Sequence, residues 1–299
     1  MSSVIAFDEI FLEIDYRKSS EHRSRLGRAC GNLVSSISLL GGKSCIITKL
    51  EDDIIGKLII QKLNKFKVNY ETVILKKEGG KNVINFVYRE DNIDKFLLHD
   101  EKQLLLKEKE LNYNLIQNYD IFHFGSRSIF RYNEFRDIIY RVKEKGLKIS
   151  FNINIRDDFF YGEKDKIYTI KQFIDIADYI KLNIYEAKCI SFQEETESIL
   201  EYITNSWENK YFFLTNGHKG SYLIYNKQIA FIKPFLTKPI DTVGCGDIYL
   251  SVILNEICDD FNQMILIAEK AGRIASLSAQ YFGVIEALSY VLHNKELNI

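Results

Sequence analysis

The sequence predicts an α/β fold in which helices cover both faces of a doubly wound, mainly parallel sheet, with a small second sheet beside it as a lid. The first observation is that short apolar runs, each ending in polar or glycine-bearing residues, alternate with amphipathic segments. The second is that two other regions read as paired strands with no helix between them. No linker rich in Pro, Gly or Ser divides the chain, so we expect one domain over residues 1–299.

The apolar runs predict the strands of the main sheet. Between them, residues 52–66 and 132–146 carry apolar side chains three and four positions apart, which is the spacing of a helix with one buried face. Because strand and helix alternate, the strands should be parallel, and function should lie at their carboxyl ends. The strand-like runs are residues 43–50, 118–126, 147–153, 178–183 and 210–217.

The lid is predicted from residues 5–19 and 81–99, which look like paired strands. The second of these regions should fold over a polar turn at Glu90 to Asp94. We therefore expect lid segments at about 8–26 and 81–100, inserted in the α/β body.

Composition limits the class of partner. Lysine plus arginine (40) nearly equals aspartate plus glutamate (41), so the net charge of -1 gives no general attraction to nucleic acid or to an anionic membrane. No apolar run approaches the ~20 residues that span a bilayer, and the first ten residues carry no basic side chain. We expect a cytoplasmic protein with a small-molecule partner.

The stretch DTVGCGD, residues 241–247, is the first candidate for chemistry. A glycine-rich turn that opens a helix aims backbone N–H groups outward, and the helix dipole adds positive potential there. The helix expected at about 245–258 is apolar almost all round, so it should be buried and hold the turn in place. Asp247 would lie beside a bound anion, where a carboxylate can take a proton from an attacking hydroxyl. The alternative is a helix capped by aspartate, with glycines that serve only the turn.

This stretch resembles the D-T-x-G-A-G-D signature of the PfkB, or ribokinase, family of carbohydrate kinases, with Cys245 in place of the usual alanine. The resemblance implies a ribokinase-like fold, ATP as phosphate donor and Asp247 as the catalytic base. It also implies that Gly244, Cys245 and Gly246 hold the γ-phosphate, and that Asp241 and Thr242 belong to the cofactor site.

A second match lies at residues 27–42, which resemble the family's sugar-binding segment. The resemblance implies that Gly31 and Asn32 contact the sugar, while Arg28 replaces a usual glycine and adds charge near it. By the same resemblance Glu13 takes the place of a sugar-binding aspartate on the first lid strand. An exposed lid-strand position is the alternative for Glu13.

A third match, residues 151–156, is similar to the D-P-N-x-R of fructokinase-like members, although Asn152 stands where aspartate is usual. Arg156 is expected to contact the substrate or, alternatively, to pair with Asp157 or Asp158. His123 ends an apolar strand and is interpreted as structural.

The remaining matches concern the nucleotide. Asn183 and Glu186 have the N-x-x-E spacing that the family uses around Mg²⁺, so the resemblance implies that both hold the metal through water. Residues 214–225 resemble the nucleotide-side T-x-G-x-x-G turn. The implied cofactor-binding residues are Asn183, Glu186, Thr215, Gly217, Gly220, Asp241, Thr242 and Gly283.

The sequence does not match two other phosphate-binding motifs. The segment GGKS at residues 41–44 lacks the glycine of a Walker A loop, since Ile37 stands there. No G-x-G-x-x-G follows the first strand, so a nicotinamide dehydrogenase is unsupported.

The sequence therefore predicts an ATP-dependent sugar kinase that uses Mg²⁺ and, as the resemblance allows, a monovalent cation such as K⁺. Fructose or a related ketose is the expected acceptor. The alternatives are a kinase for a nucleoside, a sugar acid or a phosphosugar, or a non-catalytic sugar- or nucleotide-binding regulator with the same fold. The resemblance also implies a homodimer that forms through the lid sheet.

Overall fold

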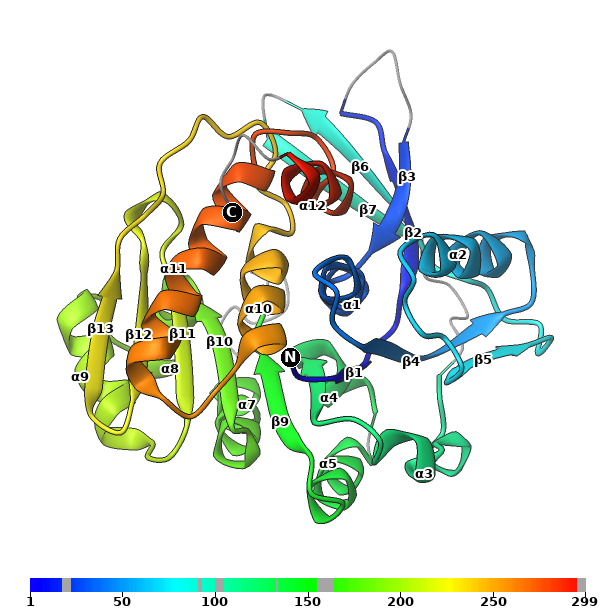
Figure 1. Ribbon diagram of the computed structural model, residues 1–299. Helices are drawn as coiled ribbons and strands as arrows, with labels where there is room; N and C mark the ends of the chain where they lie inside the picture. The colour runs from blue at the N-terminus through cyan, green and yellow to red at the C-terminus, as the bar shows by residue number, and fades with distance from the viewer. Residues whose placement is uncertain (18–22, 91–92, 100–104, 133, 155–163, 295–299) are drawn as a thin grey trace.

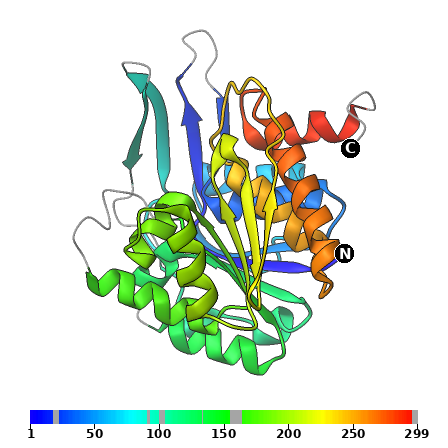
Figure 2. The same cartoon turned by 90° about the vertical axis from the view of Figure 1, so that its left-hand side faces the viewer.

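The computed structural model describes residues 1–17, 23–90, 93–99, 105–132, 134–154 and 164–294. These residues form a nine-stranded, mainly parallel sheet with helices on both faces and a separate four-stranded sheet (Figure 1). The predicted fold class is confirmed. The four-stranded sheet projects from one end of the α/β body as a lid (Figure 2).

The main sheet has the strand order β13-β12-β11-β10-β9-β8-β1-β4-β5. All neighbouring strands from β11 to β5 are parallel, while β12 and β13 add as antiparallel strands at one edge. The central strands read as continuous apolar runs because helices bury both of their sides. The bounds are β1 Val4–Phe7, β4 Ser44–Glu51, β5 Val73–Lys76, β8 Ile121–Gly125, β9 Lys148–Asn152, β10 Tyr179–Asn183, β11 Tyr211–Thr215, β12 Ser221–Tyr225 and β13 Gln228–Ile232.

Two apolar clusters lie on opposite faces of this sheet. One contains side chains of α1, α2, α10, α11 and α12, and the other contains side chains of α3, α4, α5, α7, α8 and α9. On the face of the first cluster, α1 and α10 pack against each other, and the candidate site described below lies at the start of both helices. The bounds are α1 Ala29–Leu39, α2 Ile54–Lys65, α3 Tyr113–Ile116, α4 Ser126–Arg131, α5 Phe135–Glu144, α7 Lys164–Ile176, α8 Ile184–Ser191, α9 Thr196–Ser206, α10 Cys245–Glu256, α11 Phe261–Ser278 and α12 Val284–His293, with 3-10 turns at Glu108–Glu110 and Gly217–Lys219.

The lid has the strand order β3-β2-β6-β7, with β2 Phe11–Asp15, β3 Arg23–Gly27, β6 Ile84–Glu90 and β7 Ile93–His99. Both segments expected in the lid therefore contribute to it. Two details of the prediction are wrong. Residues 5–7, read as part of a lid strand, lie in β1 at the centre of the main sheet, because this apolar run is buried on both sides. The predicted turn at Glu90 to Asp94 is also too long, because Glu90 pairs with Ile93 and backbone pairing does not require apolar side chains.

Within the described residues, no helix is both long and apolar enough to cross a lipid bilayer. The cytoplasmic location stays a prediction.

His123 lies in β8 with a fully buried ring, as expected for a structural residue. Its Nδ1 is 3.0 Å from the Ser150 hydroxyl on the neighbouring strand. Burial lowers the pKa of His123 from 6.5 to about 3, because the charged ring would lose its hydration.

This burial predicts a pH dependence of stability. As the pH falls below 6.5, the unfolded chain binds a proton at His123 that the folded chain does not, so the folded state is destabilised. Between pH 7 and pH 5 this residue should remove about 2 kcal/mol from the free energy of unfolding. Urea unfolding at both pH values should show a smaller loss for His123→Gln than for the wild type. The control is His218→Gln at an exposed site, and equal losses in all three proteins would contradict the assignment.

Candidate active site

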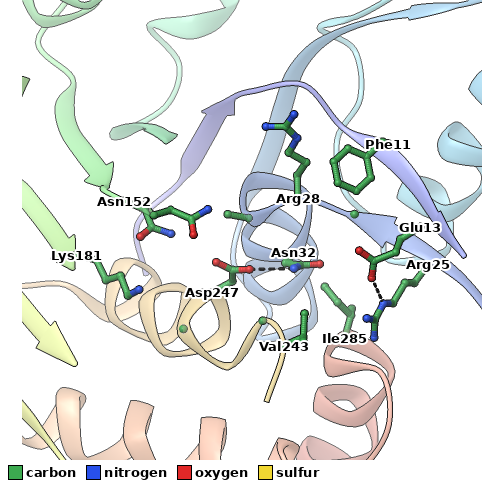
Figure 3. Close-up of a pocket in the computed structure, with 15 residues that line it drawn as sticks. Phe11, Glu13, Arg25, Arg28, Asn32, Asn152, Lys181, Val243, Asp247 and Ile285 are labelled. Carbon is green, nitrogen blue, oxygen red and sulfur yellow. Dashed lines mark hydrogen bonds and ion pairs between the residues drawn. The ribbon is translucent and has the colours of Figure 1, made fainter. Parts of the chain in front are cut away.

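The candidate site is a cavity of about 200 Å³ at the carboxyl ends of β9 and β10, closed on its other sides by α1, α10 and the lid strands β2 and β3 (Figure 3). This is the sheet edge at which function was expected. The lining residues are Phe11, Glu13, Arg25, Gly27, Arg28, Ala29, Asn32, Asn152, Asn154, Lys181, Val243, Gly244, Gly246, Asp247 and Ile285.

The glycine-rich turn caps α10 as predicted. Gly244 is its N-cap residue with φ 89 and ψ -2, a left-handed conformation that glycine adopts without a steric penalty. The N–H groups of Cys245 and Asp247 donate to carbonyls of Thr242 and Gly244. Among the described residues the amides of Gly244 and Gly246 have no carbonyl acceptor. Of the four N–H groups from Gly244 to Asp247, these two therefore remain available to a bound anion.

Asp247 lies in the first turn of α10 and faces the cavity. Its Oδ2 accepts a hydrogen bond of 2.9 Å from Nδ2 of Asn32, which lies in the first turn of α1 (Figure 3). The packing of α1 against α10 therefore brings together two predicted residues that are 215 positions apart.

Lys181 enters the same cavity from β10, although it is 93% buried. Its Nζ lies 3.1 Å from where a Cβ on residue 246 would be, so a side chain at that position would require the lysine tip to shift by a few tenths of an ångström. No hydrogen bond or ion pair to the Lys181 ammonium occurs within the described chain. This positive charge at the wall of the cavity favours an anion there.

Glu13 is buried in the cavity wall, so its reading as an exposed strand residue is wrong. One carboxylate oxygen pairs with Nε of Arg25 on β3, and the other accepts a hydrogen bond of 2.8 Å from Nδ2 of Asn85 on β6. Three lid strands thus hold this carboxylate at the edge of the cavity.

Asp241, the first residue of the signature, is 98% buried and joins the lid to the α10 turn. The guanidinium of Arg17, just after β2, donates to both of its oxygens at 2.9 and 2.6 Å, and Arg25 Nη1 lies 3.4 Å away. Burial would raise the pKa of Asp241, but the two guanidiniums outweigh it and hold the pKa below its usual value. The Asp241 carboxylate also accepts from the amides of Val243 and Gly283.

Arg28, where the family pattern has glycine, is the N-cap residue of α1 with φ 81 and ψ 149. A side chain in this region costs of order 1–3 kcal/mol. Its guanidinium pairs with Glu9 at 3.1 Å and lies over the Phe11 ring, 5.2 Å from the centroid.

Five of the predicted cofactor-binding residues lie at or just after the ends of β10 and β11 and do not line this cavity: Asn183, Glu186, Thr215, Gly217 and Gly220. Asn183 and Glu186 form a reciprocal cap on α8, in which each side chain accepts from the other's backbone N–H at 2.9 and 2.7 Å. Thr215 pairs with Asn183 across the sheet, and Gly217 and Gly220 follow it with positive φ.

The structure thus brings Asp247, Gly244, Gly246, Glu13 and Asn32 to one cavity. Arg156 lies outside the described residues. The predicted residues that do not line the cavity are Gly31, which packs against Ile10, together with Cys245, Asn183, Glu186, Thr215, Gly217, Gly220, Asp241, Thr242 and Gly283.

Two charged lining residues were missed by sequence reasoning: Lys181 and Arg25. Lys181 carried a readable signal, because a lysine inside the central run YIKLN must face a polar site. Arg25 carried none, since a lid arginine is an ordinary surface residue in a sequence. Asn154, which matches the third family motif, also lines the cavity.

The Cys245 thiol lies 3.9 Å from the backbone oxygen of Asp241. Burial and the carboxylates of Asp241 and Asp247 raise its pKa to about 12, and the thiolate is the reactive species.

No group of three or more His, Cys, Asp or Glu side chains that could hold a metal occurs in the described part of the chain. Glu186 is 99% buried and shares its carboxylate with the α8 cap. This donor set fits Mg²⁺ held mainly by phosphate oxygens and water, which is the coordination that Mg²⁺ prefers.

Comparison with known proteins agrees with this arrangement. The family model for the pfkB family carbohydrate kinase matches residues 4–289. The chain belongs to this family. It is accordingly a phosphotransferase, an ATP-dependent sugar kinase.

Among curated relatives, the putative sugar kinase PH1459 of Pyrococcus horikoshii is 29% identical over 265 residues, covering 86% of this chain and 81% of that protein. The probable fructokinase-2 of Arabidopsis thaliana is 26% identical over 272 residues, covering 86% and 82%.

Solved structures share the fold at low identity. A putative ribokinase II from E. coli in complex with ATP and Mg²⁺ has a TM-score of 0.81 at 17% identity, with 96% of each chain covered. A fructokinase double mutant from Vibrio cholerae O395 with fructose, ADP and potassium ion has a TM-score of 0.83 at 17% identity, covering 96% of this chain and 95% of the other. At this identity the likeness establishes the fold alone.

The buried pair of Arg17 and Asp241 predicts a large loss of stability on truncation. Arg17→Met leaves a buried carboxylate with only the more distant Arg25, so the free energy of unfolding should fall by about 3 kcal/mol. Urea unfolding measures this loss, and Asp241→Asn in the same chain should recover part of it.

The matched control is Arg136→Met, which removes an exposed arginine and should change stability by less than about 0.5 kcal/mol. If the two single variants were equally stable, the pair would not hold the lid as described.

Proposed function

We propose that this sugar kinase transfers the γ-phosphate of ATP to a primary hydroxyl of a small ketose, with fructose or a related ketose as acceptor. The observation that carries the proposal is the position of Asp247, which faces a polar cavity from the first turn of α10 beside the amides of Gly244 and Gly246.

The phosphate side is electropositive. The amides of Gly244 and Gly246 and the positive end of the α10 dipole favour an anion at this turn. Lys181 adds a full positive charge next to Gly246. These positive groups would lie beside the γ-phosphate oxygens, over which negative charge is spread during transfer. Positioning and charge neutralisation of this kind supply most of the acceleration.

Asp247 acts as the base. Its carboxylate takes the proton of the sugar hydroxyl, the hydroxyl oxygen forms a bond to the γ-phosphorus, and the bond from that phosphorus to the β–γ bridging oxygen breaks. ADP leaves with the bridging oxygen. Asn32 orients the carboxylate through its hydrogen bond of 2.9 Å.

The acceptor side offers hydrogen-bonding groups to a polyhydroxyl molecule. Glu13 supplies a carboxylate from the lid, and Asn32 supplies an amide from α1. Asn152 is 98% buried, and its Oδ1 has no hydrogen-bond partner in the described structure. A buried acceptor of this kind is satisfied by a substrate hydroxyl.

ATP extends from this turn toward the ends of β10 and β11, where Asn183, Glu186, Thr215, Gly217 and Gly220 lie. Glu186 and Asn183 would hold Mg²⁺ through water, and the bound metal supplies neutralisation of the phosphate charge. We assign no residues to the monovalent cation.

The lid presents apolar side chains to solvent. Tyr16, Tyr88 and Leu97 are 42%, 39% and 60% exposed, which supports a homodimer through the lid sheet.

Asp247→Asn tests the assigned base. The amide keeps the size of the side chain but accepts no proton, so kcat should fall about 10²- to 10⁴-fold, while the dissociation constant for ATP stays within about threefold. Coupled ADP release and calorimetric ATP binding measure the two quantities, with fructose as the first acceptor.

The matched control is Asp165→Asn, the same change in the exposed first turn of α7. Full turnover by Asp247→Asn would remove Asp247 from the mechanism. ATP or sugar binding without turnover in the wild type would favour the non-catalytic regulator.

Lys181→Met tests the charge beside Gly246. Without the ammonium the transferring phosphoryl group loses a charged partner, so kcat/KM for ATP should fall about 10- to 100-fold. Steady-state kinetics at varied ATP give this ratio, with Lys148→Met at an exposed site of β9 as the control. Equal values for the two variants would mean that Lys181 does not face the phosphates.

A further inference from the structure

Three arginines converge on one buried carboxylate at the acceptor side of the cavity. Glu9 lies between β1 and β2 and is 97% buried. Its Oε2 is 3.1 Å from Arg28 Nη2 and 3.7 Å from Arg127 Nε, and its Oε1 pairs with Nε of Arg131. The arginines come from the start of α1 and from α4, so this cluster is assembled by the fold.

The cluster also contains a second carboxylate, that of Asp8, which is buried beside Glu9. Burial raises the pKa of Glu9 above its usual value even beside the arginines, which disfavours its charge. Burial and the charge of Arg28 lower the pKa of Arg127, with Arg131 adding to the effect.

Arg28 connects this cluster to the cavity. It lines the cavity, and in Figure 3 its side chain runs from the start of α1 away from Asp247 and past the Phe11 ring. Its side chain is about 90% buried, yet its buried Nε has no hydrogen-bond acceptor among the described residues. A buried guanidinium donor without an acceptor indicates a ligand group that supplies one.

The backbone makes this arginine informative. With φ 81 and ψ 149, position 28 has a conformation that glycine adopts freely and other residues adopt rarely. An arginine therefore occupies a position whose backbone conformation would suit glycine. Its ion pair with Glu9 leaves the Nε–H group without an acceptor among the described residues.

We infer that the acceptor is a sugar that carries an anionic group, a carboxylate or a phosphate, which binds Arg28 at the end of the cavity remote from Asp247. This inference rests on the proposed function and narrows its acceptor class from ketoses in general to charged ones. The hydroxyl that receives the phosphoryl group then lies at the opposite end of the sugar from the anion. A planar guanidinium binds either kind of anion through paired N–H groups.

The test compares three acceptors in Mg-ATP-dependent ADP release: fructose, the sugar acid ketodeoxygluconate, and fructose 6-phosphate. At least one anionic acceptor should exceed fructose in kcat/KM, and the better of the two names the anion as carboxylate or phosphate. In Arg28→Gly the ratio of kcat/KM for that acceptor to kcat/KM for fructose should fall roughly 10- to 100-fold, as for a lost hydrogen bond to a charged group.

Arg28→Gly suits this test because glycine fits the backbone at position 28, so the variant should fold. The matched control is Lys67→Gly, which makes the same change at another residue with positive φ, 58, at an exposed site after α2. Its acceptor ratio should equal that of the wild type.

Calorimetric binding of the three sugars separates this inference from the proposed function. Arg28-dependent binding of an anionic sugar without ADP release would overturn the proposed function and leave this inference standing. Turnover or binding of fructose at least as strong as that of both anionic sugars, with a ratio that Arg28→Gly leaves unchanged, would overturn this inference and leave the kinase standing.

Discussion

The structure depends on a buried ionic contact between the lid and the turn that starts α10. Arg17 and Arg25 come from the lid, and both bind Asp241, the first residue of the glycine-rich signature. A buried carboxylate is tolerated only when charged groups and donors surround it, and here the lid supplies those charges. The lid strands and the glycine-rich turn are therefore held as one unit, although Arg17 and Asp241 are 224 positions apart in the chain.

The rest of the site follows from this constraint. Arg25 also binds Glu13, so the same arginine that fixes the turn places a carboxylate at the acceptor side of the cavity. On the opposite wall, α10 packs against α1, and Asp247 meets Asn32. The two substrates of a phosphoryl transfer must meet in line at a short distance, and in the proposed mechanism this buried frame holds the groups assigned to both of them.

Much of this could be predicted from the sequence. The parallel sheet followed from the alternation of apolar strands and amphipathic helices, and the turn that caps α10 followed from two glycines before a buried helix. These features are local in the chain. The resemblance to the PfkB family correctly named the family and added Glu13 and Asn32 to the candidate site, which the structure places in one cavity with Asp247.

The partners of charged side chains could not be predicted, because they depend on the folded arrangement of distant segments. Asp241 was interpreted as a cofactor residue, yet Arg17 and Arg25 bind its carboxylate. The sequence left two interpretations of Glu13, a sugar-binding carboxylate or an exposed strand residue. Its pairing with Arg25 depends on the register of β2 and β3, which the sequence does not give. The departures from the family pattern at Arg28 and Asn152 were visible in the sequence, but their burial and their unsatisfied polar atoms appear only in the structure.

The most direct measurement of the central claim is ³¹P NMR of the purified protein with Mg-ATP and a mixture of neutral and anionic ketoses. The account predicts that each ADP formed is matched by one new sugar phosphate monoester and that inorganic phosphate does not accumulate. ADP accompanied only by inorganic phosphate, or ATP left intact while the sugars bind, would contradict it.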